Sequence, residues 1–267
     1  MLGTAVQAAA PSTIQQVALR HANLAIEDAE AVDRVVARER PEWIVNCAAY
    51  TQVDRAEAEP EAAQRVNAVG AANLARAARA TGARLLHIST DYVFDGRATR
   101  PYREDDPVGP LNVYGRTKLA GEQAVRDILP QAHLIVRTQW LFGEGGPNFV
   151  ATILRLARER PELKVVNDQH GRPTYAADLA VALWTLIARD ARGTVHCANE
   201  GAATWFDVAK AAIEIAGLHT TVVPCSTADM PRPARRPPYS VLDCTRYEGI
   251  VGSPLRPWQA ALKQLTS

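Results

Sequence analysis

Short apolar runs alternate with stretches of helical periodicity through the first half of the chain. Four runs have the length and composition of buried strands, at residues 14–20, 42–49, 83–90 and 132–142. Three intervening stretches carry apolar residues at helical spacing, at residues 28–40, 60–82 and 114–129. The second of these ends at Gly82, a residue type that commonly terminates helices. Strands and helices in this rhythm predict an α/β fold, a doubly wound parallel sheet with helices on both faces.

The second half of the chain is less regular. It reads as four helices, at residues 148–163, 176–190, 204–218 and 254–265, with short strands near residues 164–167 and 193–201. Thr204 is placed to cap the third helix, with Asp207 three residues further on. We expect one domain at residues 1–145, joined by parts of 165–198. Residues 146–164 and 199–267 are then expected to form a smaller region.

Composition narrows the class of protein. The 267 residues are 47% apolar and 22% charged, which is ordinary for a globular chain, and the net charge is +1. No polybasic field points to nucleic acid or to an acidic membrane surface, and no export signal or membrane span is evident. The four cysteines form no CxxC pair and no histidine cluster accompanies them, so neither a disulfide framework nor a metal site is expected. We expect a cytoplasmic protein with reduced thiols.

Tyr114 and Lys118 are the first candidates for chemistry. Residues four apart share one face of a helix. An ammonium beside a phenol favours the phenolate and should lower the pKa of the tyrosine, which would let it exchange a proton with a substrate oxygen. Such a pair also occurs by chance on helix surfaces, and the spacing alone leaves that alternative open.

Hydroxyl groups stand at the end of the strand that precedes this helix. The run 83–90 ends in Ser89 and Thr90 and is followed by Asp91. Ligands of parallel sheets bind beyond the carboxyl ends of the strands, so these side chains could reach the same substrate oxygen as Tyr114. The alternative is that they bind only to the backbone of the adjoining loop.

Six motifs together resemble the extended short-chain dehydrogenase/reductase family, and within it the dTDP-4-dehydrorhamnose reductases. They are NCAAYTQVDRAE at 46–57, STDYVFDG at 89–96, PLNVYGRTKLAGE at 110–122, RTQWLFG at 137–143, NDQHGRPT at 167–174 and RPARRPPYSVLD at 232–243. The resemblance implies a Rossmann-like fold and NADPH or NADH as cofactor. It makes the domain at residues 1–145, with parts of 165–198, a dinucleotide-binding domain that lacks its start, and it makes residues 146–164 and 199–267 a substrate-binding region. It also implies reduction of the C4 keto group of a nucleotide-linked deoxysugar, dTDP-4-dehydro-L-rhamnose, to dTDP-L-rhamnose. Whether a metal takes part cannot be deduced from the motifs.

The resemblance also implies roles for individual residues. Thr90, Tyr114 and Lys118 match the catalytic triad, in which threonine holds the ketone oxygen, tyrosine protonates it, and lysine lowers the tyrosine pKa and binds the nicotinamide ribose. The expected cofactor-binding residues are Gly3, Cys47, Ala48, Ala49, Asn67, Tyr114 and Lys118. The expected substrate-binding residues are Ser89, Asp91, Tyr92, Trp140, Arg235 and Arg236.

Several of these positions have simpler explanations. Ala48 and Ala49 suit tight packing as well as a nearby dinucleotide, and Trp140 could be a core tryptophan. Asn67 could be a solvated surface residue, and the two arginines could lie in a solvated basic loop. Gln139 stands where relatives often have serine, and His87 is expected to be a packed core histidine.

The chain departs from the family pattern at its start. Relatives begin with a strand and a Gly-x-x-Gly-x-x-Gly turn, of which Gly3 matches the third glycine. We therefore expect a sheet without its first strand, a longer natural form, and impaired cofactor binding and activity in this chain. Runs 14–20 and 42–49 would then either pair directly or recruit another chain through the open edge, so a homodimer is one arrangement to consider.

Two other functions stay open on sequence alone. One is a non-catalytic NADP-binding or regulatory partner, similar to the beta subunit of methionine adenosyltransferase. The other is a nucleotide-sugar epimerase or dehydratase, since those enzymes share the tyrosine–lysine pair.

Overall fold

A four-stranded parallel sheet forms the centre of the protein. The computed structural model describes residues 1–266. The strand order is β1–β2–β3–β8, with bounds Trp43–Asn46, Arg84–Thr90, His133–Thr138 and Gly193–His196. Every neighbouring pair is parallel, with Trp43 opposite Arg84 and Leu85 opposite His133. All four strands therefore end at the same edge of the sheet, where ligands of such folds bind.

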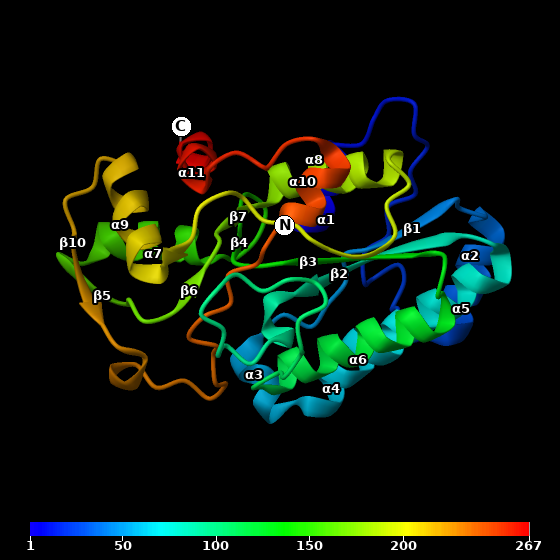
Figure 1. Ribbon diagram of the computed structural model, residues 1–267, viewed down its shortest axis with the longest axis horizontal. Coiled ribbons are helices and arrows are strands. Elements are labelled where there is room, and N and C mark those ends of the chain that lie inside the picture. The colour runs from blue at the N-terminus through cyan, green and yellow to red at the C-terminus, as the bar shows by residue number, and fades with distance from the viewer. Residues whose placement is uncertain (267) are drawn as a thin grey trace.

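Helices cover both faces of this sheet, as Figure 1 shows. One face carries α2 (Ala29–Glu39), α5 (Ala71–Thr81) and α6 (Val113–Ile128). The other carries α1 (Leu2–Ala8), α8 (Ala176–Ala188) and α10 (Thr245–Val251). Leu86 and Leu134 pack on the α8 side, whereas Leu85 and Ile135 pack on the α5 side, because successive strand residues face opposite ways. The layers confirm the doubly wound α/β fold.

The remaining elements lie around one end of the sheet or in its connections. Beside the sheet are α7 (Phe149–Glu159), α9 (Trp205–Ile215), α11 (Trp258–Thr266), β5 (Glu162–Val166) and β10 (Thr221–Cys225). The connections contain α3 (Val53–Ala58), α4 (Pro60–Gln64), η1 (Arg65–Gly70), η2 (Asp91–Val93), η3 (Thr227–Asp229) and the two-residue strands β4 (Leu141–Phe142), β6 (His170–Gly171), β7 (Thr174–Tyr175) and β9 (Ala203–Thr204). No helix within residues 1–266 combines the length and the apolar character needed to cross a membrane.

The prediction of a strand at residues 14–20 is wrong. This segment has no strand assignment, and Ile14 and Val17 are 44% and 53% exposed. Within residues 1–266, β1 pairs with β2 alone, so runs 14–20 and 42–49 do not close up on each other. An apolar run becomes a strand only when a neighbour accepts its backbone hydrogen bonds, and residues 14–20 lack one in the part of the chain that the structure describes.

The predicted strand at residues 132–142 is two strands. It breaks after Thr138, because Trp140 adopts a left-handed backbone conformation with φ of 48°. The chain then leaves the main sheet, and β4 pairs with β7 instead. The bend separates the Trp140 side chain from the sheet and directs it toward the region around α9, where it meets Trp205.

Candidate active site

Tyr114 meets Thr90 because helix α6 begins very close to the end of β2. Asn112 caps α6, its Oδ1 accepting a hydrogen bond from the Gly115 backbone N–H at 2.8 Å. A Cβ on Gly115 would lie 2.2 Å from the carbonyl oxygen of Tyr92, so only glycine permits this approach. The Tyr92 and Tyr114 rings contact edge to face, with centroids 5.6 Å apart.

The environment of Tyr114 keeps its hydroxyl protonated. Burial raises the pKa of Tyr114 to about 12, although a hydrogen bond with Thr90 opposes the shift. The expectation that Lys118 lowers this pKa is therefore wrong for the structure. The Lys118 side chain points to strand β2, where its Nζ donates to the Ile88 carbonyl oxygen. A neutral phenol at pH 7 can still donate its proton to a strongly basic oxygen.

Lys118 is directed at strand β2. Its side chain is buried, and Nζ donates a hydrogen bond to the Ile88 carbonyl oxygen at 2.6 Å and lies 3.2 Å from His87 Nε2. Burial lowers the pKa of Lys118 to about 8. His87 is buried as expected of a core histidine, and it also contacts a residue of the triad.

Asp91 uses both carboxylate oxygens inside the protein. Oδ1 accepts the Thr90 hydroxyl at 2.9 Å, and Oδ2 accepts the Ser240 hydroxyl at 2.6 Å. Burial raises the pKa of Asp91 to about 6. The carboxylate thus connects the proline-rich segment 230–243 to the end of β2 and holds Thr90 in place. Ser89, which directly precedes Thr90, is buried and lies opposite Arg137 of β3 in the sheet.

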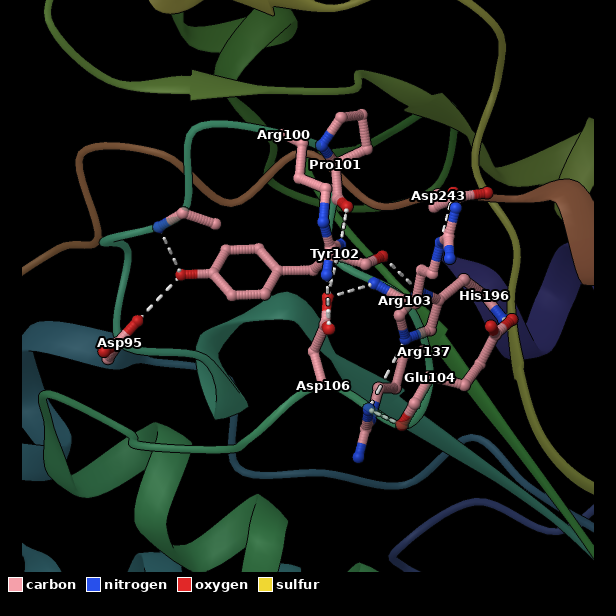
Figure 2. Close-up of polar contacts among 11 residues, drawn as sticks. Asp95, Arg100, Pro101, Tyr102, Arg103, Glu104, Asp106, Arg137, His196 and Asp243 are labelled. Carbon is pink, nitrogen blue, oxygen red and sulfur yellow. Dashed lines mark hydrogen bonds and ion pairs between the residues drawn. The ribbon is translucent and has the colours of Figure 1, made fainter.

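The loop that follows Thr90 is anchored across the ends of the central strands (Figure 2). Tyr102 donates its hydroxyl to Asp95 at 2.7 Å. Glu104 accepts the His196 backbone N–H at 2.8 Å, and its carbonyl accepts Arg137 Nη1 at 3.2 Å. These contacts hold residues 95–106 against β3 and β8.

Small residues gather at the end of β1. A Cβ on Gly3, in the first turn of α1, would lie 3.7 Å from the Cys47 Cβ. Ala48 is exposed and Ala49 half-buried. Asn67 is buried rather than solvated, and its amide pairs with the backbone of Tyr50 at 2.8 and 3.2 Å. It therefore holds the loop that carries Cys47 to Ala49.

Trp140 belongs to an aromatic cluster that includes a residue not anticipated from sequence. Its ring stacks on Trp205 with centroids 3.7 Å apart and planes 10° apart. A Cβ on Gly171 would come within 2.4 Å of the Trp140 ring. Trp205 follows the Thr204 cap at the start of α9, and its Nε1 donates to Gln169 at 3.2 Å. The only sequence signal was an aromatic residue beside that cap.

The two arginines of the PARRP motif differ. Both terminal nitrogens of Arg236 donate to Asp54, each at 2.9 Å. Arg235 has an exposed side chain, and its carbonyl oxygen accepts a hydrogen bond from Asn112 at 2.8 Å. Hence Arg236 is already neutralised by a carboxylate from α3, and Arg235 is the arginine whose charge faces solvent.

Unpaired polar atoms lie at the carboxyl end of β3. Thr138, opposite Thr90 in the sheet, has a buried Oγ1 without a hydrogen-bond partner in residues 1–266. Both polar atoms of the Gln139 amide are buried and likewise lack a partner in that range. Unpaired buried polar groups cost about 1–3 kcal/mol each, so this edge is suited to a polar ligand.

One family model matches residues 1–267, described as the RmlD substrate binding domain. The chain belongs to this family. A dTDP-4-dehydrorhamnose reductase of Streptomyces griseus is 49% identical over 253 residues, covering 92% of this chain and 83% of that protein. A solved dTDP-4-dehydrorhamnose reductase of Bacillus anthracis, in complex with NADP, is 40% identical with a TM-score of 0.95, over 99% of this chain and 94% of that one.

More distant members of the fold include nucleotide-sugar epimerases. A UDP-glucose 4-epimerase of Thermus thermophilus, in complex with NAD, is 21% identical, with a TM-score of 0.80 over 96% of this chain and 87% of that one. At this identity the likeness establishes the fold alone. The reductases of the RmlD family are nearer to this chain in both sequence and structure.

Proposed function

We propose that this RmlD-family protein reduces the C4 keto group of dTDP-4-dehydro-L-rhamnose to give dTDP-L-rhamnose, with NADPH or NADH. The observation that carries the proposal is the position of Tyr114 beside Thr90 at the carboxyl edge of the parallel sheet, with a pKa that burial raises to about 12. The 49% identity to a named reductase supports the same reaction.

The chain offers a proton donor and a second hydroxyl to the ketone. Thr90 is held by Asp91, so its oxygen has a defined position beside the substrate oxygen. Tyr114 donates its proton as negative charge develops on that oxygen, because an alkoxide is a stronger base than the phenolate. The bound nicotinamide supplies the hydride. Loss of a general acid typically costs 10²–10⁴-fold in rate.

The cofactor would lie along the end of β1 and the start of α6. The small residues Gly3, Cys47, Ala48 and Ala49 leave room for a dinucleotide, and Asn67 holds the loop that carries three of them. Lys118 would bind a ribose hydroxyl after turning from Ile88.

The substrate would bind on the other side of Thr90. Trp140 and Tyr92 offer aromatic surfaces, and Arg235 offers a guanidinium suited to the diphosphate. Ser89, Asp91 and Arg236 act within the wall of this site, since Asp91 and Arg236 already have internal partners. We propose residues 146–164 and 199–267 as the substrate-binding region, with residues 1–145 and parts of 165–198 as the dinucleotide-binding domain.

Substrate-dependent oxidation of NADPH tests the proposal. The purified chain is mixed with NADPH and dTDP-4-dehydro-L-rhamnose, and the sugar product is identified by chromatography. We expect one dTDP-L-rhamnose per NADPH oxidised, and no oxidation with dTDP-L-rhamnose itself. A folded protein that binds NADPH without turnover would favour the regulatory function, and an isomerised sugar without NADPH consumption would favour an epimerase.

A further inference from the structure

The direction of Lys118 depends on two residues outside the catalytic triad. Its Nζ lies between the Ile88 carbonyl oxygen, at 2.6 Å, and the His87 ring nitrogen Nε2, at 3.2 Å. On the other side of the ring, His87 Nδ1 lies 3.0 Å from Asn46 Nδ2. All three side chains are buried, with 1–4% of their surface exposed. Because water does not reach Asn46, His87 and Lys118, the direction of their mutual hydrogen bonds determines which nitrogen carries each proton.

The backbone fixes the orientation of the Asn46 amide. The Ala48 N–H donates to Asn46 Oδ1 at 3.0 Å, and an N–H group cannot face an amide nitrogen favourably. The amide oxygen thus points to Ala48, and the NH₂ group points to His87. An NH₂ group only donates, so His87 Nδ1 must be the acceptor.

This acceptor role determines the tautomer of His87. Burial lowers the pKa of His87 well below its usual value, so the ring is neutral. A neutral imidazole carries one proton, and with Nδ1 accepting, that proton is on Nε2. The Nε2–H group then points at Lys118 Nζ.

We propose that Asn46 and His87 are positioning residues that hold Lys118 facing β2 and disfavour its charged form. An ammonium has only donors, and it would oppose the Nε2–H group. A neutral amine has a lone pair that accepts that proton while it still donates to the Ile88 carbonyl. The proposal rests on the proposed function only in giving Lys118 a catalytic role.

The other groups around Lys118 also influence its pKa, but none of them places an N–H group against Nζ as His87 does. Burial is the largest influence on Lys118 and lowers its pKa to about 8. Glu122, one turn later on α6, and Cys47, after β1, act in the opposite direction. The Glu122 carboxylate is bound by Arg137 on β3 and Arg126 on α6, so its charge is largely balanced.

For the reaction, this means that the charge of Lys118 depends on where its side chain points. While the lysine faces His87 its charged form is disfavoured, and Lys118 is not among the groups that influence the pKa of Tyr114. Turning Lys118 toward an acceptor such as a ribose hydroxyl releases it from the Nε2–H group, and this favours its charged form.

The tautomer of His87 can be observed in the unmodified protein. The chain has six histidines, and long-range ¹H–¹⁵N correlation spectra distinguish protonated from unprotonated ring nitrogens for each. Without nucleotide, we expect His87 neutral with its proton on Nε2 from pH 6 to 8. A proton on Nδ1, or a charged ring in this range, would overturn the proposal.

A variant then tests the effect on the lysine. The chain has four lysines, Lys118, Lys164, Lys210 and Lys263, so ¹⁵N-lysine labelling gives a readable titration. His87→Leu should raise the Lys118 midpoint by about one pH unit, as expected for removal of one opposing donor. His133→Gln, at a buried histidine bound to Leu129, should leave it unchanged.

The Lys118 titration and the keto-sugar reduction assay can fail independently of each other. An unchanged or lower Lys118 midpoint in His87→Leu would overturn the inference, whether or not the protein reduces the keto sugar. If His87→Leu does not fold, the tautomer measured in the unmodified protein decides. In an active enzyme, the variant should also shift the alkaline limb of the kcat–pH profile upward, which a purely structural role would not do.

Discussion

Replacing Glu122 by glutamine should destabilise the protein by about 3–5 kcal/mol, the range for breaking a buried ion pair. Glu122 has no exposed surface and Arg137 has 1%. The carboxylate accepts Arg137 Nε at 2.9 Å and Nη2 at 2.8 Å, and it also accepts Arg126 at 2.6 Å. Glutamine keeps one acceptor and turns an NH₂ group toward the guanidinium, so Arg137 keeps its charge without a matching anion.

The lowered pKa of Glu122 indicates that its charge stabilises the folded protein by a similar amount. Burial opposes its charge, but the hydrogen bonds and charge of Arg137 outweigh burial and lower the pKa of Glu122 from 4.5 to about 2. That difference corresponds to about 3 kcal/mol of stability at neutral pH. Because the folded pKa is the lower one, this stability is present above pH 4.5 and is lost as the pH falls toward 2.

Urea unfolding at pH 7 measures the change in the free energy of unfolding. The matched control is Glu159→Gln, in an exposed pair with Arg155, for which at most about 0.5 kcal/mol is expected. The double variant Glu122→Leu with Arg137→Met removes both charges and should recover much of the loss. If Glu122→Gln costs no more than Glu159→Gln, the buried charge pair is not the source of stability.

Two further predictions concern packing and pH. Gly121→Ala should destabilise by at least about 1–3 kcal/mol in urea unfolding, because its Cβ would lie 2.1 Å from the Asn67 carbonyl oxygen. Gly249→Ala, with open space around it, should be neutral or stabilising, and equal losses in both variants would refute the packing explanation. The pKa of Asp91 is raised to about 6, so its contribution to stability is present below about pH 4 and is lost as the pH rises through 6. The stability of Asp91→Asn relative to the parent should therefore increase by about 2 kcal/mol from pH 4 to 7, and a constant difference in thermal unfolding would contradict this.

Local sequence rules succeeded where neighbouring residues decide the structure. Gly82 ends α5 in the left-handed conformation, and Thr204 with Asp207 forms the expected capping box on α9. Thr90 and Tyr114 come together because parallel strands end at one edge and α6 starts there. The alternation of strands and helices therefore predicted the fold class, and the motifs predicted that Thr90 and Tyr114 lie close together.

Features that depend on distant partners could not be predicted in this way. Asp54 and Arg236 are 182 residues apart, so nothing local indicates that the arginine is already paired. The strand expected at residues 14–20 fails because a strand needs a neighbour, which an apolar pattern does not supply. Likewise, the spacing of Tyr114 and Lys118 gives a shared helix face but not the direction in which the lysine turns.

The most direct test of the proposed reaction is the kcat of Tyr114→Phe with NADPH and dTDP-4-dehydro-L-rhamnose. The substitution removes only the hydroxyl and keeps the ring that contacts Tyr92. We predict that kcat falls by at least about 100-fold, as for loss of a general acid, while the KM for the sugar and the unfolding midpoint change little. A variant that turns over at a rate close to that of the parent would contradict the assignment of Tyr114 as the proton donor.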